Sequence, residues 1–165
     1  MELIKINRIF IGIDPSMSNN GIAVWSSLDK KFNKLCTLEF WAAYFYFCEW
    51  ITLHKSGTIN LNVIIEDNTQ NKPRFTEKYK TKIAGKRNNE DSVLEHISQS
   101  IGENKAVAKL WIKFFENNGI KVQRIKPTKK SITKISHQQF CKMTHFDGKH
   151  SNEHSRDAAM LVYGR

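Results

Sequence analysis

The chain begins with three short strand-like segments before its first helical segment. Residues 8–14 (RIFIGID) form an apolar, β-rich run that ends in a carboxylate, and residues 15–21 are rich in turn formers. Residues 22–25 and 35–40 have the same β-rich character. Because the connections between these segments are short, neighbouring segments can pair only in opposite directions. We therefore expect the fold to start with a three-stranded antiparallel meander.

The rest of the chain alternates between helical and strand-like segments. Helices are expected over residues 40–54, 90–118 and 153–164, with a short one over 138–142, and strands over 61–65 and 122–125. A helix between two strands favours a parallel pair. The prediction is a single α/β domain over residues 1–165. Its central mixed sheet has five strands, three antiparallel and then parallel ones, and is flanked by helices.

The first helix is expected to bury one aromatic face. The spacing of its large side chains selects a stripe made of Trp41, Tyr44, Phe45, Cys48, Ile51 and Thr52. Such a stripe is more often part of a core than a platform on which bases stack, so these side chains are predicted to pack inside the fold.

The positive charge of the chain is concentrated in its second part, and the net charge is +10. Residues 1–70 carry six Lys and Arg against seven Asp and Glu, whereas residues 71–165 carry twenty against nine. A polyanion is the natural partner of such a basic surface, because every neutralised phosphate releases condensed counterions. A lysine-rich surface that only keeps the protein dissolved is the alternative.

Two basic segments hold the candidate phosphate contacts. Residues 68–89 have almost no apolar content, which is typical of a functional loop. The candidates in this loop are Lys72, Arg74, Lys78, Lys80, Lys82, Lys86 and Arg87. A second segment follows the last strand and contributes Lys129, Lys130 and Lys134. Taken singly, each lysine is at least as often solvated surface as a phosphate contact.

Three acidic residues and a histidine stand at the ends of expected elements. Asp14 ends the first strand, Glu66 ends the strand of residues 61–65, and Asp157 lies in the last helix, three residues after His154. The carboxyl ends of strands converge in sheets of this kind, and residues three apart share a helix face. Crowded carboxylates repel unless cations compensate, and hard divalent ions prefer oxygen ligands. The expected occupant is Mg²⁺ or Mn²⁺, although an Asx turn is an equally ordinary role for Asp14 alone.

Cysteine and histidine residues permit a second metal hypothesis. A zinc site of the Cys-x3-His and His-x3-His type would use Cys141, His145, His150 and His154. The chain has three cysteines and no CxxC pair, which favours reduced thiols over disulfides.

Nothing in the sequence suggests a membrane or secreted protein. No run approaches the ~20 apolar residues of a membrane helix. The N-terminus lacks the basic, apolar and cleavage regions of a signal peptide. We expect a cytoplasmic protein.

Three short motifs carry a resemblance to a known family. Residues 11–24 (IGIDPSMSNNGIAV) contain Gly-Ile-Asp-Pro, a turn and a second strand led by Gly. Residues 63–66 (VIIE) are an apolar strand that ends in Glu, and residues 154–159 (HSRDAA) place Asp and two Ala after His154. In order and spacing these motifs resemble the RuvC family of Holliday-junction resolvases, within the RNase H-like nuclease superfamily. The resemblance spans residues 9–163, and His154 stands where many members have Asp.

The resemblance implies an RNase H-like fold and a Mg²⁺-dependent endonuclease. Such an enzyme resolves four-way junctions or other branched DNA as a homodimer, by paired nicks that leave 5′-phosphate and 3′-hydroxyl ends. The resemblance also implies that Asp14 bridges two ions held ~3.5–4 Å apart. Glu66, His154 and Asp157 would complete the ligand shells, and Mn²⁺ would substitute for Mg²⁺.

Further expectations follow for the DNA contacts and the source. The lysines after the last strand would hold the scissile backbone, the loop of residues 68–89 would grip the junction arms, and Phe75 is the candidate wedge aromatic. The implied location is the cytoplasm of a bacterial cell or of a phage-infected host.

Two other functions stay open from the sequence. One is another RNase H-like nuclease that acts on flaps or RNA–DNA hybrids. The other is a nucleic-acid-binding module without catalysis.

The subunit contact of the expected homodimer is assigned to the helix of residues 90–118. This helix has more apolar residues than one buried face needs. The candidates for the contact are Val93, Ile97, Trp111 and Phe115, and a role in the core of one chain is the alternative for them.

Overall fold

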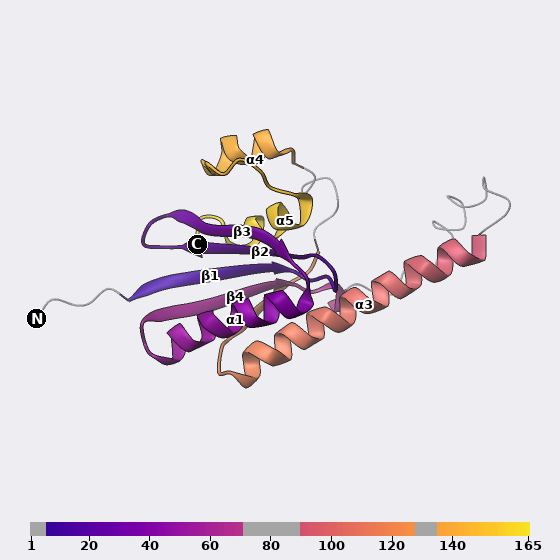
Figure 1. Cartoon of the computed structure of the whole chain (residues 1–165), viewed down its shortest axis with the longest axis horizontal. Helices are drawn as coiled ribbons and strands as arrows, with labels where there is room; N and C mark the ends of the chain where they lie inside the picture. The colour runs from indigo at the N-terminus through magenta and orange to yellow at the C-terminus, as the bar shows by residue number, and fades with distance from the viewer. Residues whose placement is uncertain (1–5, 71–89, 128–134) are drawn as a thin grey trace, which may run out of the picture.

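The computed structural model describes residues 6–70, 90–127 and 135–165, with the backbone alone for residues 90–97 (Figure 1). The first part contains β1 (Asn7–Asp14), β2 (Asn20–Ser26), β3 (Lys31–Leu38), α1 (Phe40–Lys55), β4 (Ile59–Glu66) and the 3-10 turn η1 (Asn68–Gln70). The remainder contains α3 (Glu90–Asn117), β5 (Val122–Ile125), α4 (His137–Thr144) and α5 (Glu153–Val162). Each strand and helix expected from the sequence is present, with ends shifted by a few residues.

The five strands form one mixed sheet in the order β3-β2-β1-β4-β5. β2 pairs antiparallel with β1 and with β3. β4 pairs parallel with β1 and with β5. The predicted α/β fold, with three antiparallel strands followed by parallel ones, is confirmed. Because β1 is central and pairs on both sides, several elements meet at its carboxyl end.

Helices cover both faces of the sheet. Every second residue of β1, namely Ile9, Ile11 and Ile13, faces a core shared with α1 and α3. On the other face, Ile64 of β4 packs in a second core with Ala158 of α5 and with part of α4. Figure 1 shows α1 and α3 on one side of the sheet and α4 and α5 on the other. No helix within the described ranges is long and apolar enough to cross a membrane.

The buried face of α1 differs from the predicted one. Trp41 and Phe45, expected inside, are 62% and 67% exposed. Thr52 is exposed as well, whereas Ile51 is buried and Tyr44 and Cys48 are half-buried, so the prediction was right for only part of the stripe. The buried residues of this helix are Ala43, Phe47 and Ile51. Large apolar residues surround most of this helix, and its spacing alone does not select one face. The small Ala43 lets the helix lie close to the sheet, and Phe47 then fills the space beside it.

Two of the candidate subunit contacts in α3 belong to the core of one chain. Trp111 and Phe115 are fully buried. The Phe47 ring of α1 lies 5.0 Å from that of Trp111 and 5.2 Å from that of Phe115, measured between ring centroids. The expectation that these two residues form a subunit contact was therefore wrong. The side chains of Val93 and Ile97 lie outside the described part of the chain.

Candidate active site

Asp14 and Glu66 end two neighbouring parallel strands. The preceding residues, Ile13 and Ile65, face the core shared with α1 and α3. Because side chains alternate along a strand, Asp14 and Glu66 point to the opposite face, where α5 lies. Ile13 and Ile65 are register partners, and adjacent strands are ~4.8 Å apart. The two carboxyl groups therefore belong to one small region at the carboxyl edge of the sheet.

α5 brings the other two predicted residues to the same region. His154 Nδ1 lies 2.8 Å from Asp14 Oδ2. The His154 side chain is 49% exposed and that of Asp14 is 14% exposed, so the pair is open to solvent on the histidine side. Asp157 follows three residues later on the same face of the helix and is half-buried.

Two glycines allow α5 to lie against the strands. A Cβ atom on Gly21 would lie 2.0 Å from the backbone oxygen of His154, and one on Gly12 would lie 2.1 Å from that of Ala158. No side chain fits at such distances, and glycine is the residue that permits this approach. Gly21 is the register partner of Asp14, and Gly12 precedes Asp14 by two residues. The contact of α5 with both glycines therefore determines the distance between α5, which carries His154, and the strand that ends in Asp14.

Asn152 fixes the first turn of α5. Its Oδ1 accepts a hydrogen bond from the backbone N–H of Ser155 at 2.8 Å, and its own N–H donates to Ser155 Oγ at 3.1 Å. This reciprocal pair is a capping box. The Asn152 amide nitrogen also donates to Thr37 Oγ1 of β3 at 3.0 Å. The turn that carries His154 is thus tied directly to the sheet.

Burial and repulsion raise the pKa of two site carboxyl groups. Burial, followed by the charges of Asp14 and Asp157, raises the pKa of Glu66 to about 7. Burial, followed by the charges of Asp14 and Glu153, raises the pKa of Asp157 to about 6. The hydrogen bond to Asp14 raises the pKa of His154 above its ordinary value. The ionised forms of Glu66 and Asp157 are therefore destabilised in this site, and a positive charge close to them would stabilise these forms.

The chemistry of these side chains fits a hard divalent cation. Carboxylate oxygens are the usual ligands of Mg²⁺. Asp157 Oδ1 is buried and has no hydrogen-bond partner among the described residues. An unsatisfied buried polar atom costs ~1–3 kcal/mol, and more when the group is charged. A cation at this point would remove that cost and the repulsion between the carboxylates.

The side-chain positions also show what would have to change for a metal ion to bind. Within the described ranges, no three His, Cys, Asp or Glu side chains are arranged to hold a metal ion. One oxygen of Asp14 is engaged by His154. Coordination by Asp14 through that oxygen requires this hydrogen bond to open, which the exposed imidazole of His154 permits.

Asn20 is a buried residue whose role the sequence did not reveal. Its Oδ1 accepts hydrogen bonds from Trp111 Nε1 of α3 at 2.9 Å and from the Ser16 backbone N–H at 3.2 Å. Its amide nitrogen donates to the Leu38 carbonyl at 3.2 Å. Asn20 therefore joins the turn after Asp14 to β3 and α3. The sequence does not distinguish Asn20 from the other turn formers of residues 15–21, because its buried partner Trp111 lies 91 positions away.

Replacement of Asn20 with Ala is expected to lower the free energy of unfolding by about 2–3 kcal/mol, since the buried Trp111 N–H loses its acceptor. Urea unfolding followed by tryptophan fluorescence measures the loss. The matched control is Asn19→Ala, at the exposed neighbouring position, where we expect little change. Equal losses in the two variants would contradict this role for Asn20.

Asp67 is a second buried polar residue that the sequence did not single out. It directly follows Glu66, and its fully buried carboxylate accepts a hydrogen bond from Arg124 Nε of β5 at 2.9 Å. The Thr69 backbone N–H donates to the same carboxylate at 2.9 Å. Burial alone would raise the pKa of Asp67, but the hydrogen bonds from Thr69 and Arg124 outweigh it and lower the pKa. Asp67 thus fixes the path of the chain just beyond Glu66.

The candidate DNA contacts fall outside the described part of the chain. They are Lys72, Arg74, Phe75, Lys78, Lys80, Lys82, Lys86, Arg87, Lys129, Lys130 and Lys134.

The zinc alternative is wrong for the described residues. His154 contacts Asp14 rather than Cys141. The Cys141 sulfur lies 3.5 Å from Nε2 of His137, which is one helical turn earlier in α4 and was not among the expected ligands. The four expected zinc ligands therefore do not come together.

Comparisons with known proteins found similarity among solved structures alone. No family model and no curated protein matches the sequence. The chain is similar to "T. thermophilus RuvC in complex with Holliday junction substrate", with 13% identity over 93% of this chain and 89% of that chain and a TM-score of 0.49. It is also similar to "Thermus thermophilus RuvC structure", with 13% identity over 93% and 90% and a TM-score of 0.46. The strand order and pairing described above remain the evidence for the fold.

Proposed function

We propose that this chain is a Mg²⁺-dependent endonuclease that resolves four-way DNA junctions or other branched DNA. Paired nicks would leave 5′-phosphate and 3′-hydroxyl ends. The observation that carries the proposal is the site at the carboxyl edge of the sheet, where His154 contacts Asp14 and where the pKa values of Glu66 and Asp157 are raised by burial and by the charge of Asp14. The basic second part of the chain supports a nucleic-acid substrate.

The proposed roles follow from the chemistry of each side chain. Two divalent ions, Mg²⁺ or Mn²⁺, would activate the attacking water and neutralise charge at the scissile phosphate. Asp14, Glu66 and Asp157 would hold the ions through carboxylate oxygens, and His154 would add an imidazole nitrogen. Gly12 and Gly21 would allow α5 to lie close enough to β1 and β2 for His154 and Asp157 to reach the ions. No side chain would become covalently attached to DNA.

A panel of substrates tests this function. We expect the purified protein to nick a four-way junction in the presence of Mg²⁺ or Mn²⁺ and not in EDTA, at the same position in two opposite strands. Faster cleavage of a flap or an RNA–DNA hybrid would favour the other nuclease. Tight junction binding with no cleavage of any substrate in either metal would favour the binding module.

Replacement of His154 with Ala is expected to lower the cleavage rate at low Mg²⁺ by a factor of about 10–100, the range for a disturbed metal site. His154→Asp should restore part of the rate relative to His154→Ala, because a carboxylate oxygen then takes the place of the lost imidazole nitrogen. Rates measured over a range of Mg²⁺ concentrations check both variants. The control is His150→Ala, at an exposed histidine whose ring lies beside that of His137 rather than at Asp14. A His154→Ala protein with unchanged metal dependence would show that His154 is not a ligand.

A homodimer is part of the proposal, because a junction presents two equivalent strands and an isologous dimer offers one site to each. The apolar surface of α1 and α3 is the proposed contact. Trp41 and Phe45 are exposed on it, and the Tyr44 ring lies 6.1 Å from Trp41, 5.6 Å from Phe45 and 5.1 Å from Phe114 of α3. Leu110 is also exposed on α3. Aromatic surfaces of this kind are enriched in subunit interfaces.

Sedimentation is expected to give a species near twice 19.2 kDa at micromolar concentration. Replacement of Phe45 with Glu should produce monomers that are still folded and unfold cooperatively, because Phe45 is exposed in the monomer. The control is Leu28→Glu, at another exposed apolar position, in the turn between β2 and β3. A wild-type protein that is monomeric both alone and on a junction would contradict the dimer.

A further inference from the structure

A cavity lies at the opposite end of the sheet from the candidate active site. It has a volume of about 620 Å³ and opens between the β2–β3 turn, the segment after α4 and the segment after α5. The pairing of β1 and β2 runs from Ile9 with Ser26 to Asp14 with Gly21. These pairs are five residues apart, which corresponds to about 17 Å along the strand. The cavity is therefore separate from the carboxylate cluster.

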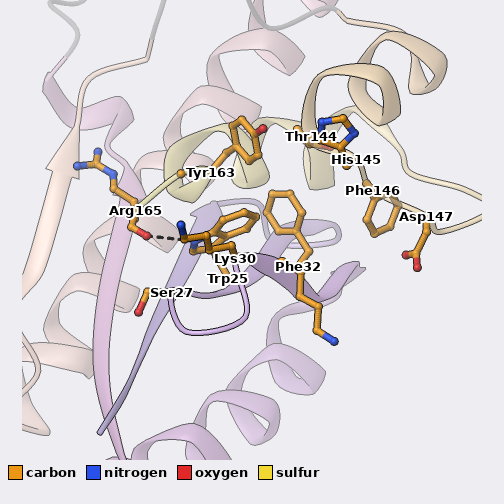
Figure 2. Close-up of a pocket in the computed structure, with 12 residues that line it drawn as sticks. Trp25, Ser27, Lys30, Phe32, Thr144, His145, Phe146, Asp147, Tyr163 and Arg165 are labelled. Atoms are coloured by element: carbon orange, nitrogen blue, oxygen red, sulfur yellow. Dashed lines mark hydrogen bonds between the residues drawn. The ribbon is translucent and has the colours of Figure 1, made fainter. Parts of the chain in front are cut away.

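Aromatic rings form one wall of this cavity (Figure 2). Phe32 of β3 is the central ring, with the ring of Trp25 at 4.9 Å and those of Phe146 and Tyr163 at 6.2 Å, between centroids. Phe32, Phe146 and Tyr163 are half-buried, so each exposes part of its surface to the cavity. The rings contact one another too closely for a ligand to enter between them. A planar ligand would instead stack on the outside of the group.

The polar lining of the cavity is mainly cationic. Lys30, Lys31 and Arg165 line it and are exposed. Asp147 is the one acidic side chain among the lining residues that the structure describes. This excess of positive charge disfavours a cationic ligand, although an aromatic wall by itself would suit one. An anionic ligand with a planar apolar part could stack on the aromatic wall and pair its negative charge with the cationic side chains.

A nucleotide has this chemistry, and the cavity has the right size for it. Ligand sites usually measure ~300–1,000 Å³ and combine apolar walls with a few polar groups. A base stacks readily on an aromatic side chain, because every base has a flat π-face. Lysine and arginine beside such a wall are typical phosphate contacts. We infer that the cavity between Phe32, Phe146 and the Lys30–Lys31 turn binds a nucleotide, with its base on the aromatic wall and its phosphate at the lysines.

Two sources of this ligand are separable by experiment. Isothermal titration calorimetry of the full chain in EDTA would compare dAMP, deoxyribose 5-phosphate and inorganic phosphate, so that metal-dependent binding at the carboxylate cluster does not contribute. A duplex with one unpaired adenosine and the same duplex fully paired test for a nucleotide within DNA. The variant is Lys30→Asn/Lys31→Gln. The control is Lys34→Gln/Lys121→Gln, which removes two exposed lysines outside the cavity.

The expected result is binding of dAMP at least tenfold tighter than binding of either base-free phosphate. The Lys30→Asn/Lys31→Gln protein should lose at least tenfold in affinity and the control protein less than twofold. The source is an unpaired nucleotide of DNA if dAMP does not bind, the bulged duplex binds at least tenfold tighter than the paired duplex, and the Lys30→Asn/Lys31→Gln protein loses that preference. The inference is overturned if dAMP binds no tighter than the base-free phosphates and the bulged duplex binds no tighter than the paired one. It is also overturned if the two double variants lose affinity equally. None of these outcomes depends on cleavage activity.

Discussion

Replacement of Asp14 with Asn is expected to abolish junction cleavage while junction binding is retained or becomes tighter. Asn has nearly the size of Asp, and its Oδ1 can still accept the hydrogen bond from His154 Nδ1, which lies 2.8 Å from Asp14 Oδ2. The variant lacks the charge that divalent cations need, so we expect the rate to fall on the order of 10³-fold or more. Removal of a negative charge does not weaken attraction to phosphate.

Single-turnover cleavage and gel-shift binding measure these two effects. Thermal unfolding is an independent readout, because a bound ion stabilises the folded chain. Mg²⁺ should therefore raise the melting temperature of the wild type and raise that of Asp14→Asn much less. The matched control is Glu116→Gln, an exposed carboxylate near the C-terminal end of α3, which covers the other face of the sheet; this variant should cleave at the wild-type rate. An Asp14→Asn protein that turns over as fast as the wild type would remove Asp14 from the mechanism.

Replacement of Gly21 with Ala is expected to lower both stability and activity. The new Cβ atom would lie 2.0 Å from the backbone oxygen of His154, so α5 or β2 must move. Overpacking of this kind costs ~1–3 kcal/mol. A displacement of about 1 Å can cost about 10²-fold in rate. We therefore expect a cleavage rate about 10²-fold lower under conditions where the variant is still folded.

The control for this experiment is Gly102→Ala. Gly102 lies within α3, and a Cβ atom there would have nothing within 4 Å. Alanine should stabilise the helix by ~0.5–1 kcal/mol and leave cleavage unchanged. Denaturant unfolding and cleavage assays of both variants test the contrast. If Gly21→Ala unfolds and cleaves like the wild type, the close approach of α5 does not position the site.

Much of the fold was predictable because its signals are local. Each strand is a short β-rich run between turn formers, and a strand that ends in Asp14 or Glu66 can be recognised without knowledge of its neighbours. The order of strands and helices then limits the sheet to a few topologies. The proximity of His154 and Asp157 to Asp14 was expected from the motif resemblance and from helix spacing, not from composition.

The features that the sequence did not reveal depend on contacts between distant residues. The face that α1 buries is set by Phe47 against Trp111 and Phe115, which no pattern within the helix specifies. Asn20 and Asp67 are ordinary turn residues until Trp111 and Arg124 come beside them. The cavity near Phe32 is formed by three segments that are far apart in the chain. Local patterns carry no information about these partners.

The contact between His154 and Asp14 also has a consequence for the time at which the site forms. The two residues are 140 positions apart. A ribosome that adds ~5–20 residues per second needs roughly 7–28 s to travel that far. During this interval a nascent chain can pair β1, β2 and β3, but it has no α5 to place on Gly12 and Gly21. Asp14 is therefore synthesised long before α5 can complete the site, and under the proposed function a growing chain would not cleave nucleic acid until α5 has been made.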